Sequence, residues 1–297
     1  MSNFVTDLNQ LEILPYSQST AERQRSAIGI FDSGIGGLTV LRELYRQLPN
    51  ESIVYFGDTA RLPYGNRSAE EITQFSREII TWMIAQDVKM VLMACNTSSA
   101  LALKRVRNEF ELPILGLIIP GANAAVQVGQ RIGVIATPAT AASSAYRQAI
   151  VEIDSQVQVW QVGCPEFVPL IEQNRIYEPY TQEIAQQYLK PLLEQQIDTL
   201  VYGCTHYPHL EYVLRKILPP TVKLIDPAKH LVAAAHRQLE IMSLKNPWAP
   251  MPTKFCVSGE PQNFAQLSEQ WLGYRPKVER VCLQENLTEQ VFLKVAD

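Results

Sequence analysis

The chain has 297 residues, of which 46% are hydrophobic and 19% charged, and its formal net charge is −4. That length is sufficient for two domains with cores of their own. The balance is slightly acidic and no long basic run is present, so we expect no nucleic-acid partner and no membrane partner. No apolar stretch is long enough to span a bilayer.

The chain has an odd number of cysteines and no C-x-x-C pair: Cys95, Cys164, Cys204, Cys256 and Cys282. This usage favours free thiols in a reducing cytosol over a disulfide framework. Residues 1–26 are mostly polar and lack the charged start, apolar stretch and small-residue cleavage site of a signal peptide. We therefore expect a cytoplasmic protein whose amino-terminal extension, residues 1–26, is loosely ordered.

The first strong strand, residues 28–31, runs into a glycine-rich turn at residues 32–37. A helix is expected next, because four leucines share one helical face ahead of Pro49: Leu38, Leu41, Leu44 and Leu48. A second strand, residues 53–56, leads into a turn-rich segment at residues 57–67.

Ser68 and Glu71 have the spacing of a capping box, which predicts the start of a second helix. The apolar side chains expected on its inner face are Ile72, Phe75, Ile79 and Trp82. A strand at residues 88–94, a helix to about residue 110 and a strand at residues 113–119 follow. This alternation predicts a parallel sheet covered by helices.

The pattern then starts again. Residues 132–137 are similar to residues 28–33, and residues 200–205 are similar to residues 91–96. The two similarities predict a duplicated α/β unit with one thiol in each half. We therefore expect two similar parallel-sheet α/β domains, related by pseudo-two-fold symmetry, with the active site in the cleft between them.

Residues 243–253 hold three prolines and are interpreted as a linker. A strand at residues 255–257, a helix near 264–272 and a strand near 278–283 follow, and we expect this tail to return to the first sheet. The expected first domain comprises residues 27–119 and 229–297, and the expected second domain comprises residues 120–228.

Cys95 and Cys204 each follow an apolar run that predicts a buried strand, and each precedes a predicted helix. They therefore fall at the carboxyl ends of parallel strands, where open α/β sheets bind ligands. The helix start behind each thiol is expected to favour the thiolate. The other three cysteines are expected to be ordinary buried small side chains.

Two opposed thiols suit the transfer of a proton off one face of a carbon and onto the other. The α-carbon of an amino acid is a very weak acid, so the site must hold a second group ready to donate a proton. The unperturbed pKa of a thiol is about 8.5, which is close to neutrality. One thiolate takes the proton while the opposing thiol gives one, and the pair exchanges roles in the reverse direction.

The glycine-rich turn at residues 32–37 admits two interpretations. Its backbone N–H groups could hold a substrate carboxylate, or it is a tight strand–helix turn capped by Asp32. The turn is not G-x-G-x-x-G, so it does not indicate a dinucleotide site. Pro63, Tyr64 and Gly65 follow the second strand and, taken alone, indicate an ordinary turn.

Several polar side chains stand at strand ends, where the ammonium and carboxylate groups of an amino acid would need partners: Asn96, Thr97, Thr137, Thr140 and Thr205. Helix capping is the alternative role for these side chains, and the two roles can coexist. The sequence alone leaves both interpretations open.

Cys204, His206 and His209 form a C-x-H-x-x-H cluster. The cluster is shorter than the usual zinc spacings and has no evident fourth ligand, so we expect no metal site. His206 fits better as a polar neighbour that tunes Cys204 or donates to substrate. Glu172 is a further candidate in the same half, and a solvated helix face is its alternative.

Taken together and in chain order, these motifs resemble those of the bacterial glutamate racemases over about residues 27–285. The matching segments are residues 32–40, 63–65, 94–97, 164–172 and 203–208. The resemblance implies a cofactor-independent racemase that interconverts L- and D-glutamate and supplies D-glutamate for peptidoglycan, and thereby for cell shape. It also implies a site between two α/β domains and a homodimer.

By motif match, the resemblance implies that Cys95 and Cys204 are the acid/base thiols, with Cys95 acting on D-glutamate and Cys204 on L-glutamate. It implies assisting roles for Asp32, Glu172 and His206, and the Pro-Leu-x-Glu match selects Glu172 rather than Glu166. The substrate-binding residues that it implies are Asp32, Ser33, Pro63, Tyr64, Gly65, Asn96, Thr97, Thr137, Thr140, Thr205 and His206.

Three other functions stay open. The first is racemisation of aspartate or a hydantoin, although the polar turns at the two thiols favour glutamate. The second is a two-lobed amino-acid-binding protein without catalysis, because a fold does not fix a function. Such a protein has no need of opposed thiols. The third is a metal hydrolase.

Overall fold

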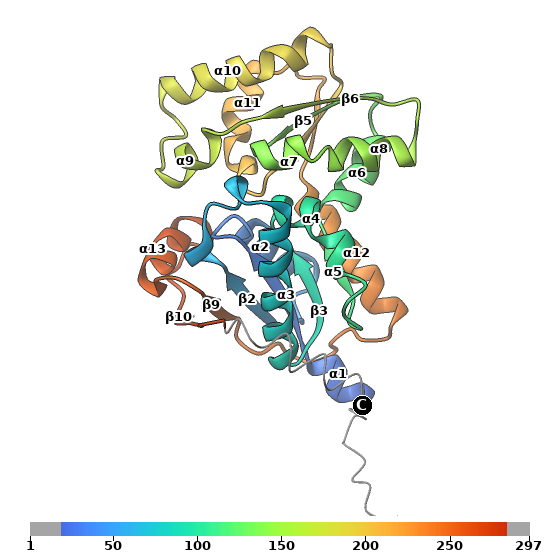
Figure 1. Ribbon diagram of the computed structural model, residues 1–297, viewed down its shortest axis with the longest axis vertical. Helices are drawn as coiled ribbons and strands as arrows, with labels where there is room; N and C mark the ends of the chain where they lie inside the picture. Colours follow the sequence, from blue (N-terminus) through green and yellow to red (C-terminus); the bar gives the residue numbers. More distant parts are fainter. Residues whose placement is uncertain (1–18, 284–297) are drawn as a thin grey trace, which may run out of the picture.

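The computed structural model describes residues 19–283 and has two lobes, each built on a parallel sheet (Figure 1). The first sheet has the strand order β10-β9-β2-β1-β3-β4. Its strands are β1 Ala27–Asp32, β2 Ile53–Gly57, β3 Val88–Met93, β4 Ile114–Gly116, β9 Lys254–Val257 and β10 Val278–Arg280. The second sheet has the order β6-β5-β7-β8. Its strands are β5 Arg131–Ala136, β6 Gln158–Gly163, β7 Thr199–Gly203 and β8 Lys223–Ile225.

The two sheets repeat one arrangement. The order β2-β1-β3-β4 in the first sheet corresponds to β6-β5-β7-β8 in the second, and each of these pairings is parallel. This match confirms the predicted fold class of two similar parallel-sheet α/β units. β9 and β10 extend the first sheet, as expected for a tail that returns to it. Cys95 and Cys204 follow the corresponding strands β3 and β7.

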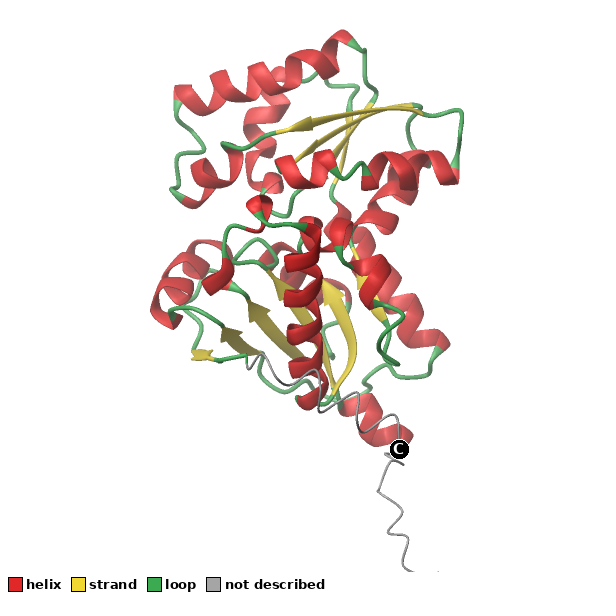
Figure 2. Cartoon of the chain, viewed as in Figure 1, coloured by secondary structure: helices red, strands yellow, loops and turns green. Residues whose placement is uncertain are grey.

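Helices lie against both sheets (Figure 2). In chain order they are α1 Thr20–Arg25, α2 Leu38–Gln47, α3 Ala69–Ala85, α4 Asn96–Leu101, α5 Leu103–Val106, α6 Ile118–Val126, α7 Pro138–Ala142, α8 Ala145–Ile153, α9 Phe167–Glu172, α10 Pro179–Glu194, α11 Glu211–Ile217, α12 Pro227–Ile241 and α13 Pro261–Leu272. Short 3₁₀ helices are η1 Thr59–Arg61, η2 Tyr64–Asn66 and η3 Tyr207–Leu210.

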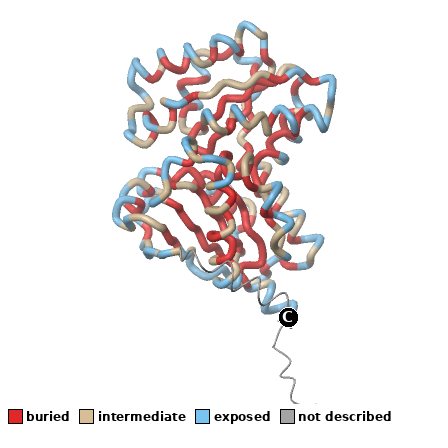
Figure 3. The backbone as a smooth tube through the Cα atoms, in the orientation of Figure 1, coloured by how far each residue is buried: buried red, intermediate tan, exposed pale blue. Residues whose placement is uncertain are grey.

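The lobes are joined where α6 packs against α12. α6 leads from the first sheet to the second, and α12 leads back and also packs on α2 of the first lobe. Buried residues are concentrated in the two sheets and where the two lobes join (Figure 3). The apolar strands therefore form the two cores, and their polar carboxyl ends are left to meet between the lobes.

The capping box at the start of α3 is confirmed. The Ser68 hydroxyl accepts from the Glu71 N–H at 3.1 Å, and the Glu71 carboxylate accepts from the Ser68 N–H at 2.9 Å. On the predicted inner face of α3, Phe75 and Trp82 are half-buried rather than buried. Phe75 lies at the rim of the lobe, where the Arg61 guanidinium covers its ring at 4.3 Å from the centroid.

Some predicted boundaries differ from the structure. The strand expected at residues 113–119 is only β4, because it pairs with three residues of β3 and α6 begins at Ile118. The helix expected to run to about residue 110 divides at Ala102 into α4 and α5. The strand expected to reach residue 283 ends at Arg280.

Part of the predicted extension is described. α1 begins at a capping box between Ser19 and Glu22, and the Gln24 carbonyl accepts from the buried Lys89 ammonium at 2.7 Å. α1 is therefore tied to the first lobe, whereas residues 1–18 lie outside the described residues. Among residues 19–283, no helix combines the length and the apolar character that crossing a membrane requires.

Candidate active site

A cavity of about 440 Å³ lies between the two lobes. Segments that follow β1, β2 and β3 line it from the first lobe, and segments that follow β5, β6 and β7 line it from the second. Cys95 and Cys204 both line it, and each is 6% exposed. Two thiols that are far apart in the sequence therefore reach one enclosed space from opposite lobes.

All but one of the predicted site residues line this cavity: Asp32, Ser33, Pro63, Tyr64, Gly65, Cys95, Asn96, Thr97, Thr137, Glu172, Cys204, Thr205 and His206. Sequence reasoning did not select the remaining lining residues: Gly34, Leu62, Asn66, Pro138, Cys164, Pro165, Val168 and Pro169. Most of these are small or apolar and carry no chemical signature. Cys164 had a usable signal, because it follows β6 as Cys95 follows β3.

The exception is Thr140, which lies behind the cavity wall. The Thr137 hydroxyl donates to the Thr140 hydroxyl at 2.9 Å, and the Thr97 hydroxyl lies 3.1 Å from each of them. Thr137 also accepts from the Thr140 N–H and so caps α7. Because Thr97 belongs to the first lobe and the other two to the second, the three hydroxyls link the lobes.

Cys95 is the N-cap residue of α4, and the carboxyl of Asp32 is close enough to influence its ionisation. Burial, followed by repulsion from Asp32, raises the pKa of Cys95 to about 12. The prediction that the helix start favours a Cys95 thiolate is therefore wrong in this cavity. α4 has only six residues, and desolvation of the thiolate outweighs the helix end. Burial likewise raises the pKa of Asp32, whose carboxylate accepts from the Gly34 N–H at 3.0 Å.

Cys204 has a different setting. It is followed by η3 and only then by α11, so the predicted helix does not start directly behind this thiol. The His206 Nδ1 atom lies 3.7 Å from the Cys204 sulfur, and its Nε2 atom lies 3.0 Å from the Glu172 carboxylate. Burial lowers the pKa of His206, but the hydrogen bonds to Cys204 and Glu172 outweigh it and raise the pKa to about 10. The imidazole is therefore protonated at neutral pH and places a positive charge beside the Cys204 sulfur.

Gly36 allows the two halves of the site to meet. A Cβ atom on Gly36 would lie 2.6 Å from two atoms of the His206 ring and would also overlap the Thr205 hydroxyl. The missing side chain therefore lets the glycine-rich turn of the first lobe contact the Cys204 segment. Since Asp32 accepts a hydrogen bond within this turn, the interpretation as a tight, Asp-capped turn also describes it.

The loop at residues 63–65 is anchored more firmly than an ordinary turn. Tyr64 is buried, and its hydroxyl donates to the Asp58 carboxylate at 2.5 Å. Arg61 forms an ion pair with the same carboxylate at 2.9 Å, and the Ser258 hydroxyl donates to it at 2.7 Å. These bonds fix the loop to the end of the first sheet, where it forms part of the cavity wall.

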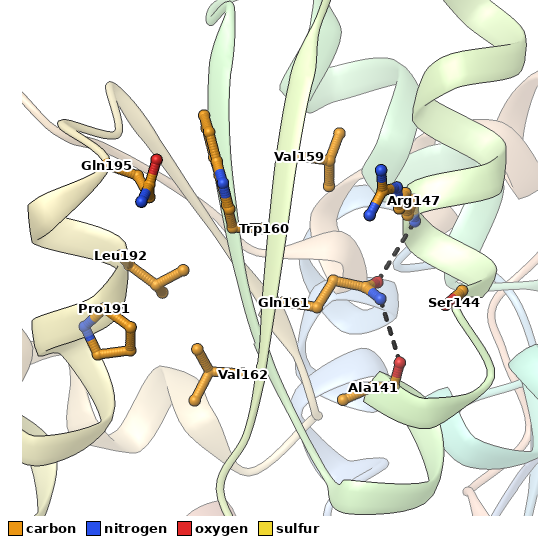
Figure 4. Close-up of a pocket in the computed structure, with 10 residues that line it drawn as sticks. All are labelled: Ala141, Ser144, Arg147, Val159, Trp160, Gln161, Val162, Pro191, Leu192 and Gln195. Atoms are coloured by element: carbon orange, nitrogen blue, oxygen red, sulfur yellow. Dashed lines mark hydrogen bonds between the residues drawn. The ribbon is translucent and has the colours of Figure 1, made fainter.

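A second cavity, of about 390 Å³, lies around the edge strand β6 of the second lobe (Figure 4). The Gln161 side chain there donates to the Ala141 carbonyl at 3.1 Å and accepts from the Arg147 N–H at 3.3 Å. Its lining residues are Ala141, Ser144, Arg147, Val159, Trp160, Gln161, Val162, Pro191, Leu192 and Gln195. None of them carries a thiol, imidazole or carboxylate, so the acid/base groups belong to the cavity between the lobes.

The C-x-H-x-x-H cluster does not gather around a common centre. His206 contacts Cys204 and Glu172, whereas the His209 ring packs on Trp271 with the ring centroids 4.1 Å apart. Across residues 19–283, no group of three or more His, Cys, Asp or Glu side chains is arranged to hold a metal ion.

Comparison with known proteins agrees with this geometry. The family model for Asp/Glu/hydantoin racemases matches residues 28–235. The chain belongs to this family. The racemase is 68% identical to the glutamate racemase of Gloeothece citriformis over 274 residues, which is 92% of this chain and 99% of that protein.

Solved structures show the same fold. The glutamate racemase of Bacillus anthracis is 37% identical, with a TM-score of 0.84 over 88% of this chain and 98% of that chain. The glutamate racemase of Francisella tularensis, solved with D-glutamate, is 34% identical, with a TM-score of 0.83 over 89% of this chain and 99% of that chain. The racemase is therefore similar to glutamate racemases in both sequence and fold.

Proposed function

We propose that this racemase interconverts L-glutamate and D-glutamate in the cavity between its lobes, without a cofactor or a metal. The observation that carries the proposal is the pair of buried thiols, Cys95 and Cys204, which line one cavity from opposite lobes. The similarity to glutamate racemases over most of the chain favours glutamate over aspartate or a hydantoin as the substrate. A binding protein without catalysis would have no use for this pair.

The surroundings of the thiols suggest their order of action. With its pKa raised to about 12, Cys95 carries a proton at neutral pH and can act as a donor. Cys204 lies beside a protonated His206 and can act as the base. With L-glutamate, the Cys204 thiolate takes the α-proton and the Cys95 thiol gives its proton to the opposite face. With D-glutamate, the two thiols exchange these roles.

After one turnover from L- to D-glutamate, Cys95 is left as a thiolate and Cys204 as a thiol. The high pKa of Cys95 favours its reprotonation, and His206, held by Glu172, lies 3.7 Å from the Cys204 sulfur that must release its proton. Asp32, Glu172 and His206 are proposed to assist in these steps. The remaining polar lining groups are proposed to bind substrate, and Thr140 to support Thr97 and Thr137 from behind the wall.

The cellular role proposed here is supply of D-glutamate for peptidoglycan, and so for maintenance of cell shape. A cytoplasmic location is proposed because the five cysteines are unpaired, which suits a reducing compartment. We further propose a homodimer, and the domain division into residues 27–119 with 229–297 and residues 120–228. The two sheets support that division, since strands from these segments form separate sheets.

Deuterium incorporation provides the test. Purified protein is incubated with L-glutamate in heavy water without added cofactor, while optical rotation and α-deuterium are followed together. We expect rotation to fall as deuterium enters the α-position, because each proton delivered comes from an exchanged thiol. Unchanged rotation and no deuterium would contradict the proposal. The same assay with L-aspartate then tests the related racemase, and calorimetry with glutamate tests the binding protein.

A further inference from the structure

Tyr146 of the second lobe reaches across to the residue next to Cys95. Its side chain in α8 is fully buried, and its hydroxyl donates to the Asn96 side-chain carbonyl at 2.6 Å. Asn96 is the first residue of α4 and lines the cavity between the lobes, whereas Tyr146 does not. The hydrogen bond therefore connects a residue outside the cavity to one in its wall.

The phenol keeps the hydrogen that it donates in this bond. Burial, followed by repulsion from Asp226, raises the pKa of Tyr146 well above its ordinary value. The hydroxyl consequently keeps its hydrogen throughout the working pH range, and in the structure it donates this hydrogen to the Asn96 carbonyl oxygen. Because the carbonyl end of the amide faces Tyr146, the NH₂ end is left for another partner.

That NH₂ group is buried and has no hydrogen-bond partner among the described residues. A buried donor without a partner is unfavourable, so such groups in native structures call for an explanation. Asn96 is 3% exposed and lines the cavity that contains both thiols. A bound acceptor, such as a carboxylate oxygen, would satisfy this donor.

We propose that Tyr146 is a positioning residue that holds the Asn96 amide with its NH₂ group ready for a carboxylate of the substrate. The proposal rests on the function proposed above, because glutamate supplies the carboxylate. It also explains why Tyr146 is fully buried: a phenol that moved with solvent could not select one orientation of the amide. The neighbouring Thr97 hydroxyl contacts Thr137 and Thr140, so both residues after Cys95 are held by the second lobe.

Tyr146→Phe removes the hydroxyl and keeps the ring. We expect KM for glutamate to rise about tenfold with kcat within about threefold, since a hydrogen bond to a charged group is lost or weakened while the thiols stay in place. Tyr202→Phe is the matched control. Tyr202 is as buried in the same lobe, but its hydroxyl has no hydrogen-bond partner among the described residues, so KM should not change.

A double-mutant cycle tests whether Tyr146 acts through Asn96. If it does, Asn96→Ala and the double variant Asn96→Ala/Tyr146→Phe should have equal KM values. Additive effects, or an unchanged KM in Tyr146→Phe, would overturn the proposal. Thermal unfolding of each variant shows whether the protein is folded at the assay temperature, so that a change in KM is not mistaken for a loss of stability.

Glutamate binding measured by calorimetry separates failure of this proposal from failure of the proposed function. If the unmodified protein binds glutamate without racemising it, the function is wrong, yet Tyr146→Phe should still weaken binding about tenfold. If the unmodified protein racemises glutamate and Tyr146→Phe binds it equally well, the role of Tyr146 is wrong and the function stands.

Discussion

The two halves of the site stand on matching strands but surround their thiols differently. Thr97 and His206 occupy corresponding positions, two residues after Cys95 and Cys204. Thr97 reaches hydroxyl groups of the opposite lobe, whereas His206 bonds to Glu172 of its own lobe. The duplicated backbone therefore places two thiols alike, and the residues around them surround each thiol with different chemical groups.

The carboxylates of the two halves are also placed differently. Asp32 ends β1, and Ala136 ends the corresponding strand β5. The second half instead brings Glu172 from α9, and this carboxylate contacts an imidazole rather than lying beside a thiol. Burial, followed by the Asp32 carboxyl, raises the pKa of Cys95, while a protonated imidazole lies next to Cys204. The two thiols therefore have unlike neighbours, which is what the proposed acid and base require.

The largest effect is expected from removing either thiol. Cys95→Ala and Cys204→Ala should each lower racemisation in both directions by on the order of 10⁴-fold, because each direction needs one thiol as base and the other as acid. Cys282→Ala is the control, since Cys282 does not line the cavity and is exposed, which shows that the prediction of a buried side chain is wrong at this position. Chiral chromatography of glutamate after incubation measures the rates. Near-normal turnover in either single variant would refute the two-thiol mechanism.

A smaller effect is expected where the halves touch. Gly36→Ala should lower kcat/KM by about 100-fold, since the new Cβ would displace His206 and Thr205 from the Cys204 segment. Gly163→Ala is a milder comparison in the second lobe, because its added Cβ would lie 3.3 Å from the Pro138 Cα, a tight contact without the overlap expected at Gly36. If Gly36→Ala folds with an unchanged melting temperature and keeps its activity, close contact between the halves is not needed.

The pH dependence separates the two halves further. His206 loses its proton above its pKa of about 10, so kcat/KM for L-glutamate should decline there. Glu172→Gln removes a carboxylate that raises this pKa, so the alkaline limb of the profile should move down by about one pH unit. The substrate amino group titrates equally with both proteins, so the difference between the two profiles reports the enzyme.

Glu166→Gln is the matched control for this shift. Glu166 precedes the same helix but does not line the cavity, and the sequence motif selected Glu172 instead. Its pH profile should coincide with that of the unmodified enzyme. If the alkaline limb of the pH profile moves equally in both variants, its position depends on the overall charge near α9 and not on the contact between His206 and Glu172.

The sequence was sufficient to predict the two sheets and the thiols, because apolar strands followed by polar turns are local patterns. The repeat of residues 28–33 in residues 132–137 became the central strands β1 and β5. The ionisation of Cys95 was not predictable, since it depends on burial and on Asp32, which lies on another strand. The local pattern predicts a helix end that favours the Cys95 thiolate, whereas the tertiary structure raises the pKa of this thiol.

Contacts between the lobes could not be predicted from the sequence either. The bond from Tyr146 to Asn96 spans 50 residues, and nothing in a buried aromatic on a helix indicates that its hydroxyl has a distant partner. Thr140 shows the opposite case. It was predicted as a substrate contact from its polar position, but the structure places it behind Thr97 and Thr137.

The two lobes also differ at the amino-terminal ends of their strands, on the side of each sheet that faces away from the site. In the first lobe, Lys89 and Glu51 form an ion pair of 2.6 Å with both side chains almost fully buried, and Lys89 also donates to the carbonyls of Gln24 and Leu244. In the second lobe, Asp198 accepts from two backbone N–H groups instead. A buried charge that loses its partner is costly, whereas a surface pair contributes little.

Glu51→Gln should therefore lower the free energy of unfolding by about 3–5 kcal/mol and leave kcat/KM of the folded enzyme unchanged. The site is unaffected because Lys89 lies at the start of β3 and Cys95 follows its far end, about 20 Å away along the strand. Glu109→Gln breaks the partly exposed pair with Arg77 and should cost below about 1 kcal/mol. Urea denaturation compares the two variants. If both variants lose the same free energy of unfolding, Lys89 has found another partner. The buried ion pair would then contribute no more to stability than the partly exposed one.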